Sequence, residues 1–330
     1  MTAIAASLPA NSPHLRPLNI LRDLPAVADL IEKCFADTMD AEGRSYLQQM
    51  RRAGQDNMFL RWASSAVETA SMPLSGFVWE EDGAILGNVS LIPYHHKRKR
   101  IYLIANVAVH PDRRRKGIGR LLTQAAIARA DQRHSSATWL HVRDDNPGAI
   151  SLYRGLGFVE LARRTTWQAK PERNACTDGL GIMITKRTAR DWSQQGPWLE
   201  RIYPDLLTWY QPMPWRSLRP GLGPAFYRFM MDYDVRHWVA RSEGTVQAVL
   251  SWQSMATRND RLWAAVPPDG SERALTALLL YARREMAWRQ YLTLDFPAAH
   301  YQAAIEAAGF QPHRTLLWMK LQPGNSVSHS

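Results

Sequence analysis

The 330-residue sequence contains only two cysteines, Cys34 and Cys176. The two lie far apart and have no metal-ligand spacing, which excludes both a disulfide framework and a cysteine-based metal site. We therefore expect two reduced thiols in a cytoplasmic protein, and no bound metal.

Long hydrophobic runs are also absent. No apolar segment approaches the roughly 20 residues that cross a bilayer, so a membrane is not an expected partner. The opening segment MTAIAASLPANSPHLRP lacks the basic start and the apolar core of a secretory signal. We interpret residues 1–13 as a flexible tail.

Acidic residues are too few to balance the basic ones: 30 oppose 41, which leaves a formal net charge of +11. Only seven of the basic residues are lysines, and the arginines are scattered along the chain. A nucleic-acid-binding protein would more often show a basic helix or a recognisable binding motif, and neither is present. The excess therefore indicates a solvated surface that prefers anionic ligands, and nucleic acid is not an expected partner.

What is present is the composition of a folded protein, 45% hydrophobic and 22% charged, in a chain long enough for two domains. Apolar spacing predicts a strand from Leu15, a helix that starts at Asp23–Pro25, and two strands joined by a turn at 81–83. The next elements are predicted as a basic hairpin turn over 95–100, a buried strand over 101–109, a helix over 119–133, a strand over 137–143, a helix from Pro147 capped by Asn146, and a strand from Phe158. This order predicts an α/β fold with a mixed sheet.

The stretch VAVHPDRRRKGIGRLL, residues 107–122, places a basic run before two glycines and a predicted helix. A P-loop would need Gly-Lys-Ser/Thr, and a dinucleotide fingerprint would need a third glycine where Leu122 stands. Residues 114–119 instead match Gln/Arg-x-x-Gly-x-Gly/Ala and resemble the coenzyme A loop of the GCN5-related N-acetyltransferase (GNAT) family. Such a loop offers free helix N–H groups to a pyrophosphate, which Gly117 and Gly119 allow to approach the backbone closely.

Downstream, NPGAISLYRGLGF, residues 146–158, resembles the family pattern Asn-x-x-Ala-x-x-Leu-Tyr-x-x-x-Gly-Phe in the expected order. The resemblance implies that Asn146 contacts the coenzyme, that Ala149 packs closely, and that Tyr153 stands near the thioester sulfur. It also implies acetyl-CoA as cofactor, with its pantetheine arm paired to the preceding strand as an extra strand would be. The expected cofactor-binding residues are Val107, Ala108, Val109, Arg114, Arg115, Lys116, Gly117, Ile118, Gly119, Arg120, Asn146 and Tyr153.

Acetyl transfer to an amine needs a base for the amine proton and an acid for the departing thiolate. By the resemblance, Tyr153 is the candidate acid. His141 is the candidate base, because relatives that acetylate ribosomal protein termini carry a glutamate there and histidine can do the same work; a structural histidine is the alternative. Glu80 or Glu81 acting through water is a further alternative. The glutamate of histone-type enzymes has no counterpart, because Leu103 stands in its place.

The second half repeats the first, with a hairpin turn at 242–244 and Gly309-Phe310 in the place of Gly157-Phe158. Its counterpart of the phosphate loop has lost the second glycine, and Asp269 and Glu272 would repel a pyrophosphate. Ile305 stands where the first half has Tyr153. We therefore expect this half neither to hold coenzyme A well nor to catalyse, although it could line the acceptor pocket.

These observations predict a tandem arrangement. We expect a GNAT domain with intact acetyl-CoA motifs over 14–169, a linker over 170–180, a degenerate GNAT-like domain over 181–323 and a tail over 324–330. The chain is expected to be a monomer or a homodimer.

The resemblance implies an N-acetyltransferase that moves an acetyl group directly from acetyl-CoA to a primary amine in the first domain. A non-catalytic acyl-CoA sensor and a protein or tRNA acetyltransferase are the alternatives. In this family the acceptor is set by loops whose shape one sequence does not reveal. A small amine, an amino acid, an antibiotic and a peptide or protein terminus all stay open as acceptors.

Overall fold

The computed structural model describes residues 12–54, 73–175, 181–210, 212–232, 234–255 and 259–322. Nearly all of the two expected tails, as well as Cys176 and residues 177–180 of the expected linker, lie outside these ranges. The chain forms two compact units: unit 1 comprises Met1–Leu161 and Leu317–Ser330, and unit 2 comprises Ala162–Leu316. The return of the chain to unit 1 at Leu317 is a feature that the sequence did not reveal.

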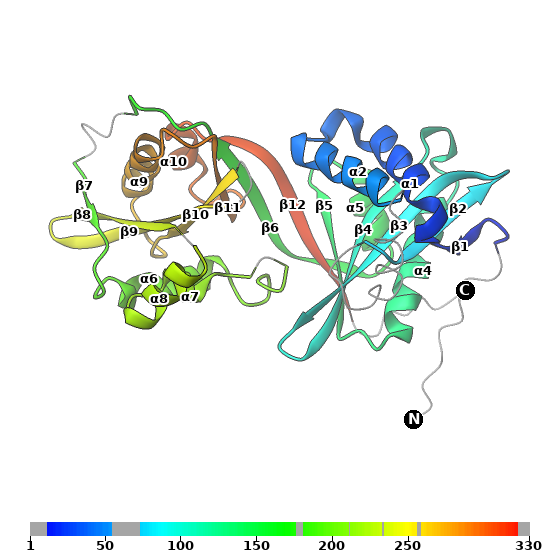
Figure 1. The fold of residues 1–330 in the computed structure, drawn as a ribbon, viewed down its shortest axis with the longest axis horizontal. Helices are drawn as coiled ribbons and strands as arrows, with labels where there is room; N and C mark the ends of the chain where they lie inside the picture. The colour runs from blue at the N-terminus through cyan, green and yellow to red at the C-terminus, as the bar shows by residue number, and fades with distance from the viewer. Residues whose placement is uncertain are drawn as a thin grey trace. The chain divides into compact units, whose positions relative to one another are not determined.

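Unit 1 is a mixed sheet with helices on both faces (Figure 1). Its strands follow the order β1-β2-β3-β4-β5, then the end of β12 and the start of β6; neighbours are antiparallel from β1 to β4, whereas β4 and β5 are parallel. The elements before β6 are β1 (Leu15–Pro17), α1 (Ile20–Phe35), the 3-10 helix η1 (Ala36–Thr38), α2 (Ala41–Ala53), β2 (Gly76–Glu81), β3 (Ala84–His96), β4 (Lys99–Val109), the 3-10 helix η2 (Pro111–Arg113), α4 (Ile118–Gln132), β5 (Ala137–Arg143) and α5 (Pro147–Arg154).

Strand alternation divides the apolar side chains of this sheet between two cores. Phe77 and Leu91 pack with Leu122 of α4 on one face. On the other face, Val78 packs with Leu24 and its neighbours in α1 and α2. The predicted hairpin turns at 81–83 and 95–100 and the predicted helix after Gly117 are confirmed.

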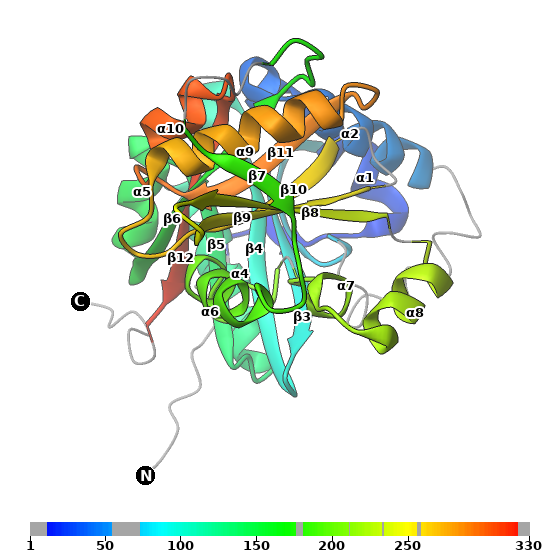
Figure 2. The same cartoon turned by 90° about the vertical axis from the view of Figure 1, so that its left-hand side faces the viewer.

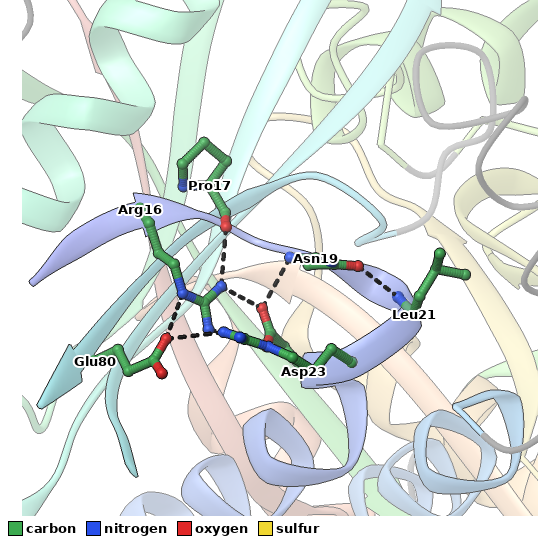
Figure 3. A network of polar contacts seen from close by, with 7 residues as sticks. Arg16, Pro17, Asn19, Leu21, Asp23 and Glu80 are labelled. Carbon is green, nitrogen blue, oxygen red and sulfur yellow. Dashed lines mark hydrogen bonds and ion pairs between the residues drawn. The ribbon is translucent and has the colours of Figure 1, made fainter. Parts of the chain in front are cut away.

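Helix α1 begins a turn earlier than predicted, so the start expected at Asp23–Pro25 was wrong. Asn19 is the N-cap, and its side-chain oxygen accepts the Leu21 N–H at 3.0 Å. Asp23, which is 1% exposed, accepts the Asn19 N–H at 2.8 Å and the Arg16 guanidinium at 2.6 Å (Figure 3). Burial would raise the pKa of Asp23, but these hydrogen bonds outweigh it and hold that pKa below its ordinary value.

A β-bulge redirects the end of β4. The pairing with β3 shifts between Asn88↔Ala108 and Ser90↔Ala105, and Asn106 takes a left-handed backbone with φ 51°. The Asn88 side chain secures the bulge by donating to the Asn106 carbonyl at 2.9 Å. Beyond the bulge, β4 continues to Val109. The path of this last segment determines where its backbone lies in the candidate site described below.

Unit 2 repeats this architecture, as predicted. Its strands follow the order β6-β11-β10-β9-β8-β7, and β10 and β11 are parallel as β4 and β5 are. Helices α9 and α10 lie on one side of this sheet, and α6, α7 and α8 lie on the other (Figure 2). The elements are β6 (Phe158–Ala169), β7 (Met183–Lys186), α6 (Trp192–Ile202), α7 (Trp215–Leu218), α8 (Leu222–Met230), β8 (Val235–Ser242), β9 (Thr245–Gln253), β10 (Asn259–Ala265), α9 (Glu272–Glu285), β11 (Tyr291–Pro297), α10 (Gln302–Ala307) and β12 (Gln311–Leu321).

Among the described residues, no helix combines the length and the apolar character that a membrane span requires.

Candidate active site

The glycine-rich loop enters α4 in unit 1 without a side-chain cap. Gly117 is the N-cap, with φ 80°, and the first turn of the helix contains no acidic residue. The first N–H groups of α4 are therefore left for an outside acceptor, at the positive end of the helix dipole. A Cβ on Gly117 would meet nothing within 4 Å, so the space in front of the loop is open. This loop fits a phosphate group.

A cavity of about 730 Å³ lies in front of the loop. It brings together every predicted cofactor-binding residue except Lys116. The remaining walls come from the end of α1 and from the segment that connects β5 to α5. The lining residues are Cys34, Phe35, Thr38, Val107, Ala108, Val109, Arg113, Arg114, Arg115, Gly117, Ile118, Gly119, Arg120, Arg143, Asp145, Asn146, Gly148, Ala149, Leu152 and Tyr153.

Strands β4 and β5 separate next to this cavity. Within the described chain their register runs from Ile101↔Ala137 to Ile104↔Leu140 and no further. Past that point β4 continues to Val109 and β5 to Arg143. The backbone from 107 to 109 thus borders the cavity as a strand edge, to which an extended amide-containing chain can bind.

Helix α5 carries Tyr153 to the cavity. Asn146 caps this helix by accepting the Ala149 N–H at 3.1 Å, and Pro147 follows in the first turn. Tyr153 is 7% exposed and packs edge-on against Phe158, with ring centroids 6.1 Å apart. Burial raises the pKa of the Tyr153 phenol, which therefore keeps its proton at neutral pH and is able to donate it.

His141 lies on β5 and is not among the residues that line the cavity. Leu140 and Val142 face the α4 core, so alternation turns His141 to the opposite face of the strand. There its ring packs against Trp318 of β12, with centroids 4.0 Å apart and the ring planes tilted by 44°. The structure thus brings Tyr153 and the phosphate loop to one cavity and places His141 on the neighbouring strand face.

Several residues of the cavity were not predicted from the sequence. Phe35 and Thr38 belong to the junction of α1 and η1, which carries no motif. Arg143 and Asp145 form an ion pair at 2.7 Å beside Asn146. The only available signal for this pair was their position just before the Asn-x-x-Ala pattern.

The thiol of Cys34 also lines the cavity, and it donates a hydrogen bond to the Val109 carbonyl at 3.3 Å. Burial raises the pKa of Cys34 and outweighs the opposing effect of the nearby Arg114. The thiol is therefore protonated at neutral pH. In the described part of the chain, no three His, Cys, Asp or Glu side chains are grouped as metal ligands.

The equivalent place in unit 2 is closed by the protein itself. Ser271 is the N-cap of α9, and its side chain accepts the Ala274 N–H at 3.3 Å. The Tyr301 hydroxyl donates to the Pro267 carbonyl at 3.3 Å. A Cβ on Gly270 would come within 2.5 Å of that hydroxyl, so the approach to the turn is filled.

Sequence similarity to a known family covers much of unit 1. A model of the acetyltransferase (GNAT) family matches residues 31–158. The ribosomal protein bS18-alanine N-acetyltransferases of Escherichia coli strain K12 and Salmonella typhimurium strain LT2 are 42% identical to this chain over 62 residues. That stretch is 19% of this chain and 42% of each relative, so the match spans less than half of the relatives' length.

Solved structures extend the likeness to the whole chain. A GCN5-related N-acetyltransferase from Sphaerobacter thermophilus superposes with a TM-score of 0.54 at 15% identity, covering 95% of this chain and 96% of that one. A tandem GNAT protein from the clavulanic acid biosynthesis pathway gives 0.50 at 16% identity, covering 96% and 99%. Residues 31–158 thus match the GNAT family, and the fold of the chain is that of a tandem protein with two GNAT-type domains.

Proposed function

We propose that this protein is an acetyl-CoA-dependent N-acetyltransferase whose active site is the cavity of unit 1. The observation that supports this most strongly is the meeting of three features at one cavity: the uncapped start of α4, the free edge of β4 and the buried phenol of Tyr153. Each matches one part of an acyl-coenzyme A, namely the pyrophosphate, the pantetheine amides and the thioester.

The residues present fit the coenzyme chemically. Backbone N–H groups from Gly117 to Arg120 would hold the pyrophosphate, with Arg114 and Arg115 adding positive charge. Arg115 has a left-handed backbone with φ 60°, which folds the loop tightly before Gly117. Val107 and Val109 would pair with the pantetheine amides, and Lys116 would act only through long-range charge, because it does not line the cavity.

Bound acetyl-CoA supplies an acetyl carbon that forms a bond to the amine nitrogen while its bond to sulfur breaks. Tyr153 then holds the proton that the thiolate needs, since its phenol is kept neutral by burial. The amine must lose one proton in the same reaction, and we assign its acceptance to His141 acting through water, because His141 does not itself line the cavity. The contact with Trp318 fixes the plane of that imidazole. Tyr153 thus loses one proton and His141 gains one. Exchange of protons with solvent returns both side chains to their starting states.

A protein terminus is the acceptor class that a specific observation favours. The 62 residues shared with the bS18-alanine N-acetyltransferases are 42% identical, far above the 15% and 16% found with the two structural neighbours that match the whole chain. Small amines belong in the same screen, because acceptor choice in this family depends on loops outside the coenzyme motifs. Tyr153 speaks against a pure acyl-CoA sensor. A protein that only binds the coenzyme would not need a proton donor near the thioester.

The test starts from coenzyme binding to the full-length chain. A ligand at 100 times its Kd stabilises by about 2.7 kcal/mol, so coenzyme A should raise the Tm by several degrees. Gly117→Glu should abolish this rise, because it places a carboxylate where the pyrophosphate lies. Gly83→Glu is the matched control: Gly83 has φ 79°, equally open surroundings and a position in the β2–β3 turn, so its substitution should leave the rise intact.

Turnover is then measured by thiol release from acetyl-CoA with a panel of small amines and alanine-terminated peptides. The wild-type chain should release thiol with at least one acceptor, and Gly117→Glu should not. No effect of millimolar coenzyme A on the Tm of the wild-type chain would contradict the proposal outright. Binding without turnover across the panel would instead support the sensor function.

A further inference from the structure

Unit 2 contains a chain of polar groups on its α6–α7 side that the acetyltransferase chemistry does not use. Ser251 of β9 is fully buried and accepts a hydrogen bond from the Gln195 amide at 2.9 Å. Its hydroxyl lies 2.8 Å from Nδ1 of His237. Gln195 in turn accepts from Arg187 at 2.8 Å, and the Arg187 backbone N–H donates to the His237 carbonyl at 3.3 Å.

This network favours one tautomer of His237. The Ser251 oxygen accepts from the Gln195 amide, and within the described residues the Ser251 proton has one acceptor, Nδ1 of His237. We therefore assign the proton of the neutral imidazole to Nε2, which leaves no buried hydroxyl proton without an acceptor. That nitrogen is buried and has no hydrogen-bond partner in the part of the chain that the structure describes. An N–H donor is therefore left without an acceptor.

The charges of two guanidinium groups, those of Arg187 and Arg228, act on His237. Arg187 donates to the Leu218 carbonyl and Arg228 of α8 donates to the adjacent Ser217 carbonyl, at 2.5 Å and 2.9 Å. In both arginines only the Nη1 atom donates to protein acceptors. The Nε and Nη2 N–H groups of Arg187 and Arg228 have no acceptor among the described residues. The open groups of this cluster are all donors, and two of its members carry a positive charge.

The electrostatic balance agrees with the geometry. Burial and then the charge of Arg228 lower the pKa of Arg187 to about 10. Burial and then the charges of Arg187 and Arg228 lower the pKa of His237 to about 3, so this imidazole is neutral at physiological pH. The carboxylate of Asp191 acts on Arg187 only at a distance, because its own hydrogen bonds go to Arg241 and Thr188. Among the described residues, no carboxylate is hydrogen-bonded to Arg187, Arg228 or His237.

We propose that Arg187, Arg228 and His237 form a binding site for an oxyanion, the carboxylate or phosphate group of a small molecule, separate from the coenzyme cavity of unit 1. The N–H groups of this cluster need hydrogen-bond acceptors, and its two guanidinium groups need a negative charge nearby. An oxyanion supplies both, because it carries several lone pairs and a negative charge. Both arginine side chains are partly exposed, so a solute can reach them. The competing explanation is purely structural: the two arginines would do no more than bind the last carbonyl groups of α7.

The experiment uses the full-length Gly117→Glu chain, so that anions cannot bind at the phosphate loop of unit 1. Inorganic phosphate and sodium acetate are titrated separately at constant ionic strength, while the histidine side chains are observed by NMR in 15N-labelled protein. His237→Gln identifies the His237 signal. We expect one of the two anions to shift the His237 Nε2–H resonance saturably and to raise the Tm. A stronger response to phosphate identifies a phosphoryl ligand, and a stronger response to acetate identifies a carboxylate.

Arg228→Gln should weaken anion binding by roughly tenfold or more. Arg228→Lys should restore part of it, since it keeps the charge. Arg216→Gln is the control, because this exposed arginine lies on the adjacent α7 and contacts the ring of Tyr227 instead. The proposal is overturned if neither anion moves the His237 signal, or if Arg228→Gln lowers the Tm but leaves anion affinity unchanged. The second result is what the structural explanation predicts.

Discussion

Gly117 and Ser271 are the N-cap residues of equivalent helices, α4 and α9, and of the two only Ser271 caps its helix with a side-chain hydrogen bond. In unit 2 the first-turn N–H groups are thus partly satisfied by the protein, and Glu272 adds a negative charge beside them. In unit 1 no side chain caps the equivalent helix. The two halves therefore differ in whether the protein itself satisfies the first N–H groups of the helix.

The first prediction follows from this pair. Ser271→Ala should destabilise the protein by about 1 kcal/mol, the usual cost of losing an N-cap. It should leave the affinity for coenzyme A unchanged, because the proposed coenzyme site lies at α4. Urea unfolding and coenzyme titration of the same variant measure the two effects, and Ser271→Thr should preserve stability. A loss of coenzyme affinity in Ser271→Ala would show that the second half takes part in coenzyme binding.

The second prediction concerns the acid. Tyr153→Phe removes the phenol proton and keeps the ring, so kcat should fall by about 100-fold or more, while the KM for acetyl-CoA changes little. Tyr102→Phe is a matched control, because Tyr102 is another buried tyrosine of the same core. Steady-state kinetics of both variants separate chemistry from packing. Equal kcat values for the two variants would remove Tyr153 from the proton transfer.

Local sequence signals predicted much of unit 1. Hairpin turns depend on a few neighbouring residues, so Asp82-Gly83 and Lys97-Arg98, all with positive φ, lie where the turns were expected. The start of α4 after Gly117 was equally predictable, because it depends on the consecutive residues 114–119. Elements with short-range causes were predictable from the sequence.

Features with long-range causes were not predictable. The contact between Trp318 and His141 joins residues far apart in the chain, and no local pattern indicates that the last strand returns to unit 1. The start of α1 was missed for a related reason: Asp23 was expected to begin the helix, but its carboxylate binds Arg16 of β1, which also binds Glu80 of β2. Which residue accepts the amine proton also depends on tertiary placement.

The third prediction tests that base. If His141 must be neutral to accept a proton, activity should fall on the acidic side of the pH profile of kcat/KM, and His141→Gln should lower kcat and flatten that limb. Trp318→Ala should reduce kcat less than His141→Gln does, because it removes only the ring that packs against His141, and Trp318→Phe should restore the wild-type kcat. His95→Gln, beside the exposed hairpin turn, serves as the control. An unchanged acidic limb in His141→Gln would assign the proton to another group.

The fourth prediction concerns the stability of unit 1 and its dependence on pH. Asp23 is almost fully buried and bonds Arg16 and the Asn19 N–H, so Asp23→Asn removes the more buried of the two carboxylates that bind Arg16 and leaves only Glu80. Removing one partner of a buried ion pair costs about 3–5 kcal/mol, and the partial exposure of Arg16, 27%, places this case at or below the lower end. Asp191→Asn is the comparison in unit 2, where a similarly buried aspartate binds Arg241 at 2.6 Å.

The sign of the pH effect follows from the lowered pKa of Asp23. A carboxylate with a lower pKa in the folded state stabilises the protein above its unfolded pKa, and that stability is lost as the pH falls through the folded value. The free energy of unfolding should therefore differ most between wild type and Asp23→Asn at neutral pH, and the difference should shrink below about pH 4, where the unfolded carboxyl begins to bind protons. Urea unfolding of both proteins between pH 3 and pH 7 measures this difference. A gap that stayed constant over this range would mean that Asp23 stabilises α1 through its shape and hydrogen bonds rather than through its charge.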